Sequence, residues 1–111
     1  MKYFIYEQDK PVEVTEGRYY EWEVTDKYNY NFEDYMLVLD EVRITIQVTY
    51  IGIFDDFEKP KPFVLVYSEK KHGEAEDLKL VEYYETYEAV INRKKALKQR
   101  HLSYYNSKSL V

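Results

Sequence analysis

The chain of 111 residues contains no cysteine and only three glycines, three prolines and two histidines. The lack of cysteine excludes disulfides and thiolate metal sites, and three isolated glycines cannot build a glycine-rich phosphate loop. His72 and His101 are far apart in sequence, and neither has a second histidine at helical spacing. The sequence therefore predicts no cofactor and no metal site.

Long apolar runs are also absent. The first apolar run ends at Glu7, which makes it too short for the hydrophobic part of a secretory signal. No window approaches the roughly 20 apolar residues that span a bilayer. We expect a soluble protein with no membrane partner and a cytoplasmic location.

Catalytic motifs are missing as well. Serine occurs only at position 68 and within the last nine residues, and there is no G-x-S-x-G motif. Neighbouring residues of a strand point to opposite faces, so neither Asp40-Glu41 nor Asp55-Asp56 forms a paired-carboxylate site. Asp55, Asp56 and Glu58 offer oxygen ligands, but DDFEKPKP lacks the ligand spacing and central glycine of a calcium loop. We predict that the protein is not an enzyme.

The strongest pattern that is present lies in residues 42–54, VRITIQVTYIGIF. Apolar and polar residues alternate as far as Tyr50, which is the period of a strand with one buried and one exposed face. Most of these residues are β-branched or aromatic, as strands prefer. Gly52 predicts a bulge or a close approach of another backbone.

Shorter strands are expected around this central one, over residues 2–7, 12–14, 18–24, 63–67 and 79–84. In RYYEWEV (18–24), the alternation places Tyr20, Trp22 and Val24 inward and Tyr19, Glu21 and Glu23 outward. This strand is expected to form a hairpin with residues 12–14, with its turn at Gly17. Proline favours a further turn at Asp9-Lys10-Pro11. YMLVL (35–39) and FVLVY (63–67) are apolar on both faces. For 32–41 a strand is slightly favoured over a helix, whose stripe would hold the residues Phe32, Tyr35, Met36 and Leu39.

A helix is expected from Tyr87 to about Tyr105. Thr86 is a suitable N-cap because its hydroxyl accepts a backbone N–H, and residues 106–111 are expected to fray. The apolar stripe holds Val90, Ile91, Leu97 and either His101 or Tyr104. Strands followed by a helix predict one α+β domain: a twisted antiparallel sheet or partial barrel of five to six strands with one C-terminal helix packed on it.

Charge and tyrosine are distributed unevenly. Residues 1–88 hold all 21 acidic and ten of the 16 basic residues, a net charge of −11, whereas residues 89–111 carry +6. Tyrosine, which occurs 14 times, is enriched at protein interfaces, and spaced carboxylates attract basic surfaces. Small proteins of phages and archaeal viruses can have such a composition, but no residues match a family motif.

We therefore predict a small non-catalytic protein that engages a basic protein partner, for example a nucleic-acid-handling enzyme, as an inhibitor or decoy. The expected partner-binding residues are Tyr19, Glu21, Glu23, Tyr28, Tyr30, Glu33 and Asp34.

Two alternatives remain. The C-terminal helix could bind nucleic acid, with Tyr104 and Tyr105 stacking on bases. However, an ordinary amphipathic helix explains the same cations, and the acidic body repels nucleic acid. A homo-oligomer could form if strand 2–7 is an unpaired edge. The expected nucleic-acid-binding residues are Arg93, Lys94, Lys95, Lys98 and Arg100.

Overall fold

The computed structural model describes residues 1–27, 34–39 and 41–109, except for the side chains of 39 and 101–109. The described chain holds seven strands and two helices. Their bounds are β1 Lys2–Glu7, β2 Lys10–Val14, α1 Glu16–Thr25, β3 Tyr35–Leu39, β4 Val42–Tyr50, β5 Ile53–Phe54, β6 Phe63–Lys71, β7 Asp77–Tyr84 and α2 Tyr87–Ser109.

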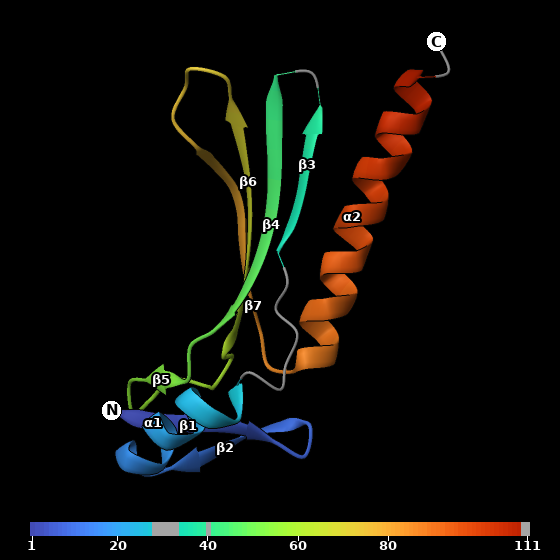
Figure 1. The fold of residues 1–111 in the computed structure, drawn as a ribbon. Helices are drawn as coiled ribbons and strands as arrows, with labels where there is room; N and C mark the ends of the chain where they lie inside the picture. The colour runs from blue at the N-terminus through green and yellow to red at the C-terminus, as the bar shows by residue number, and fades with distance from the viewer. Residues whose placement is uncertain (28–33, 40, 110–111) are drawn as a thin grey trace.

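All strand pairs are antiparallel and form two sheets. Sheet A has the order β2-β1-β5, and sheet B has the order β3-β4-β6-β7. In Figure 1, α2 runs alongside the upright sheet B, while sheet A and α1 lie across its lower end. The α+β class with a C-terminal helix is confirmed. The strands nevertheless form two open sheets rather than one sheet or partial barrel, and the described residues contain more strands than predicted.

The predicted central strand is confirmed as β4. Its even-numbered residues from Ile44 to Tyr50 are buried, whereas Gln47 and Thr49 are exposed. β3 pairs with one edge of β4 and β6 with the other, so residues 35–39 are a strand and not a helix. The predicted close approach at Gly52 is also present, because the Phe4 N–H donates to the Gly52 carbonyl at 2.7 Å.

Helix α2 begins as predicted. The Thr86 hydroxyl accepts a hydrogen bond from the Ala89 N–H at 3.2 Å, and Val90 and Leu97 are buried in the core. The helix continues to Ser109, so residues 106–109, predicted to fray, are helical. Residues 110–111 lie outside the described part of the chain.

Residues 16–25 form a helix, and the predicted strand 18–24 is wrong. The Thr15 hydroxyl caps α1 by accepting from the Arg18 N–H at 3.3 Å. Tyr19 and Trp22, three residues apart, share the buried side of the helix, while Tyr20 and Val24 are exposed. The burial of Trp22 and the exposure of Glu21 are confirmed. The faces assigned to Tyr19, Tyr20 and Val24 are wrong, and so is the hairpin at Gly17. A short run with several aromatic residues fits both the two-residue period of a strand and the 3.6-residue period of a helix. The helix start signal at Thr15-Glu16 favours the helix.

The β1–β2 hairpin turns at Gln8-Asp9, one residue earlier than predicted. Both residues have positive φ, 52° and 59°, which is the conformation of a type I′ two-residue turn. Pro11 therefore lies within β2, opposite Tyr6. An edge strand tolerates proline because its outward side needs no donor.

This turn predicts a stabilising double substitution. Gln8→Asn with Asp9→Gly should raise the free energy of unfolding by about 1 kcal/mol, because asparagine and glycine adopt positive φ more readily than the present residues. Urea unfolding measures the change. Asp9→Ala keeps a Cβ and should bring no gain. An unchanged or lower midpoint for the Asn-Gly variant would contradict the turn geometry.

Candidate interaction surface

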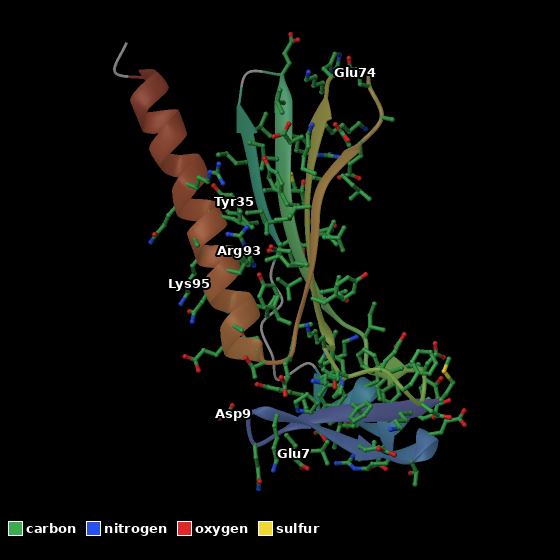
Figure 2. All side chains as sticks on the ribbon, turned by 180° about the vertical axis from the view of Figure 1, so that it is seen from behind. Glu7, Asp9, Tyr35, Glu74, Arg93 and Lys95 are labelled. Atoms are coloured by element: carbon green, nitrogen blue, oxygen red, sulfur yellow. The ribbon has the colours of Figure 1, made fainter. Side chains whose placement is uncertain are left out.

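Sheet B has two unlike faces. On one, the covered face, alternate residues such as Ile46, Val48 and Leu65 form a buried core with Val90 and Leu97 of α2. Two polar contacts also join α2 to this face: the Arg93 guanidinium donates to the Glu82 carboxylate at 2.8 Å, and the Lys98 ammonium lies 5.0 Å from the centre of the Tyr35 ring. Figure 2 shows Tyr35 and Arg93 between helix and sheet.

These contacts divide the predicted nucleic-acid-binding set. Arg93 and Lys98 attach the helix to sheet B, and the hydrogen bond from Arg93 lowers the pKa of the Glu82 carboxyl. Lys94 is half-buried, whereas Lys95 and Arg100 are exposed, with Lys95 on the side of α2 turned away from the sheet (Figure 2). The basic helix thus acts in part as an amphipathic cover of sheet B.

The opposite side of sheet B, which we call the bare face, carries exposed apolar side chains on both edge strands. Strand alternation and the β3-β4-β6-β7 register place them together on this face. Between the two edges, β6 contributes Val64 and Val66, which are buried or half-buried. β4 contributes only polar side chains to this face: Arg43, Thr45, Gln47 and Thr49. The exposed members are Met36 (59%) and Val38 (66%) of β3, and Leu78 (63%), Val81 (44%) and Tyr83 (59%) of β7.

At the turn end of sheet B the bare face becomes basic. Val38 is paired with Arg43, and Arg43 with Lys70, in one row across three strands. This row borders an open cavity of about 550 Å³, which we call the tip pocket. The sequence alone does not reveal the tip pocket, because its residues come from two separate segments of the chain, 38–43 and 70–73. Its lining residues are Val38, Glu41, Arg43, Lys70, Lys71, His72 and Gly73.

The described members of the predicted acidic, tyrosine-bearing set do not form one exposed surface. Tyr19 was expected to face outward but is buried, because its segment is a helix. Glu21 is exposed on α1 and lies 3.6 Å from Arg18, while Glu23 is half-buried. Asp34 directly precedes β3 and accepts a hydrogen bond from Gln47 of β4 at 3.2 Å. Tyr28, Tyr30 and Glu33 lie outside the described residues.

Several tyrosine hydroxyls hold the junction of the two sheets. The Tyr50 hydroxyl donates to the Phe4 carbonyl at 2.6 Å, and the Tyr6 hydroxyl accepts from the first N–H of α2 at 3.0 Å. The Tyr19 hydroxyl accepts from the Gly52 N–H at 3.3 Å, and burial raises its pKa. These three tyrosines thus serve the core, where their rings add apolar area and their hydroxyls bond to backbone groups.

A smaller acidic and aromatic group lies on α1. Glu16, Tyr20 and Glu23 follow the i, i+4, i+7 spacing of one helix side, and we call them the α1 patch. The Tyr20 ring is 47% exposed and lies 6.3 Å from the Tyr3 ring. Burial and the nearby Glu16 carboxylate raise the pKa of Tyr3.

The carboxylates considered for a hard cation have local contacts. Asp56 lies 3.2 Å from the amino terminus, and the Glu58 carboxylate accepts from the Asp55 N–H at 3.3 Å. Within the described part of the chain, no three carboxylate or imidazole side chains converge as metal ligands.

β1 lies between β2 and β5 in sheet A, so strand 2–7, the example given for an unpaired edge, is paired on both sides. Among the described residues, neither helix combines the length and the apolar content needed to cross a membrane. Comparisons of the chain with protein-family models, curated proteins and solved structures gave no match.

Proposed function

We propose that this chain is a non-catalytic binding protein that docks a protein partner on the bare face of sheet B. The observation that carries the proposal is the group of five apolar side chains, 44–66% exposed, on both edge strands of one sheet face. An antiparallel sheet with one solvated face normally alternates apolar inward and polar outward. Where β6 and β7 meet, Val81 and Tyr83 adjoin Val66 and Val64, and continuous apolar surface of this kind is typical of interaction sites.

The charges on the bare face favour a different protein over a second copy. Arg43 and Lys70 form no ion pair within the described residues, so a complementary surface needs carboxylates. A second copy would offer Asp34 and Glu76, which already accept hydrogen bonds from Gln47 and Ser68. The expected partner is therefore a protein that presents an apolar patch with acidic side chains at one end.

The first test places charges in the bare face. Val38→Glu with Val81→Glu should weaken partner binding at least about 100-fold, because two carboxylates would be buried without partners in an apolar interface. Both positions are solvated in the free protein, so the free energy of unfolding should fall by less than about 1 kcal/mol. Partner binding is measured by retention from cell extract, followed by titration with the purified partner.

The control is Val24→Glu with Phe57→Glu. These side chains are 68% and 87% exposed and lie on α1 and in the turn after β5, outside sheet B. The control should retain the same partner. Equal retention by both double variants would contradict the proposal. Self-association that only the bare-face variant abolishes would assign the face to a second copy instead.

A second candidate function is the basic-partner hypothesis, now supported by the α1 patch rather than by the full predicted set. Glu16, Tyr20 and Glu23 still combine carboxylates with an exposed aromatic ring. A basic enzyme captured there, as by an inhibitor or decoy, would associate faster at low salt. Glu16→Lys with Glu23→Lys should slow this association while leaving the bare face intact, and an unchanged association rate would remove the candidate.

A further inference from the structure

The strongest unexplained feature outside the apolar part of the bare face is the cationic row at its turn end. Arg43 and Lys70 are directly opposite each other on β4 and β6, which places their Cβ atoms about 5 Å apart. Like charges in this position destabilise a sheet. Neither side chain forms an ion pair with any residue in the described ranges, although the protein as a whole is acidic.

The tip pocket concentrates this positive charge. Among the described residues, its lining contains the cations Arg43, Lys70 and Lys71 and the carboxylate of Glu41, together with His72. The two parts of the pocket are joined, because the His72 N–H donates to the Glu41 carbonyl at 3.0 Å. The pocket is therefore formed by connected residues at the ends of β3, β4 and β6 rather than by one isolated loop.

The pocket is continuous with the bare face. Val38 is 66% exposed there, lines the pocket and is the register partner of Arg43. A protein that covers Val38 must therefore also remove water from Arg43 and Lys70. Burying a cation without a partner costs several kcal/mol, which a facing carboxylate offsets.

From this geometry, and resting on the proposed function, we infer that the tip pocket is an anion subsite that receives aspartate or glutamate side chains of the docked partner. An arginine opposite a lysine suits a carboxylate, because the guanidinium binds two oxygens at once and the ammonium adds a third donor. The Glu41 carboxylate repels a bound carboxylate and so lowers the affinity of the subsite for it.

The subsite is tested with a hexaglutamate peptide as the probe, titrated into the full chain labelled with ¹⁵N. The amide signals of residues 43 and 70–73 should shift most. Arg43→Glu with Lys70→Glu should weaken binding about tenfold or more, since each exposed ion pair contributes a factor of about two to five. Glu41→Gln should strengthen binding about twofold.

The matched control is Lys61→Glu with Lys95→Glu. It changes the net charge by the same amount but lies in the loop before β6 and on the outer side of α2. Its affinity for hexaglutamate should stay within about twofold of the parent. Equal losses in the two double variants, or shifts confined to residues 93–100 of α2, would overturn the inference.

The same probe separates this inference from the proposed function. Val81→Glu lies outside the pocket and should abolish docking of the partner but leave hexaglutamate binding unchanged. If hexaglutamate binds at the tip and no partner needs Val81, the docking proposal fails while the anion subsite stands. If the partner needs Val81 but tolerates Arg43→Glu with Lys70→Glu, docking stands and the carboxylate assignment fails.

Discussion

Gly52→Ala is expected to lower the free energy of unfolding by about 3 kcal/mol or more. A Cβ at this position would collide with the Phe4 carbonyl oxygen and come within 2.8 Å of ring carbons of Tyr19 and Tyr50. The Phe4 carbonyl is part of the backbone and cannot move aside as the end of a flexible side chain can. The collision would also disturb two hydrogen bonds, from the Phe4 N–H to Gly52 and from the Tyr50 hydroxyl to Phe4.

The other two glycines provide internal controls for the same substitution. A Cβ at Gly17 would meet nothing within 4 Å, and Gly17 lies in α1, so Gly17→Ala should stabilise by about 0.5–1 kcal/mol. Gly73 has open space but a φ of +79°, so Gly73→Ala should cost about 1 kcal/mol through backbone strain. Urea unfolding of the three variants should give this order, and a mild effect at Gly52 would contradict the junction geometry.

Trp22→Ala is expected to lower the free energy of unfolding by about 3–5 kcal/mol, the range for emptying a large aromatic site. The side chain is 2% exposed, and its ring centre lies 4.8 Å from that of Tyr50. It therefore fixes α1 against the end of the central strand.

The neighbours of Trp22 distinguish the helix from the strand that the sequence predicts. In α1, Tyr19→Ala should also be costly, at about 3 kcal/mol or more, because the ring is 3% exposed. Tyr20→Ala should cost less than about 1 kcal/mol, because its ring is 47% exposed. If residues 18–24 formed a strand, Tyr20→Ala would be the costly substitution and Tyr19→Ala the mild one. Urea unfolding measured for both variants decides between the two structures.

Sequence patterns predicted the elements whose periodicity is long and unambiguous. β4 alternates over nine residues, and α2 has both a cap at Thr86 and buried residues at Val90 and Leu97. The segment around Trp22 failed because seven residues with three aromatic side chains fit both a strand and a helix. The capping threonine at Thr15 was the signal that could have resolved it.

The bare face was not predicted from the sequence, for a different reason. YMLVL is apolar on both faces, which suggests a strand covered on both sides, yet β3 is an edge strand with Met36 and Val38 exposed. A strand's own residues do not reveal how many layers the fold has. The number of predicted elements indicates an uncovered sheet face, because a single C-terminal helix covers only one face of a sheet. The tip pocket depends on strand register, which joins Arg43 to Lys70 across 27 positions of the chain.

The docking proposal is tested most directly by thiol labelling at the bare face. The chain has no cysteine, so Val81→Cys on the bare face and Val24→Cys on α1 each introduce one labelling site. The rate of reaction with a soluble thiol reagent is measured with and without a saturating amount of the retained partner. We expect the partner to slow labelling at position 81 at least about tenfold, since an interface core excludes water, and to leave the rate at position 24 unchanged. Equal rates at position 81 with and without the partner would contradict docking on this face.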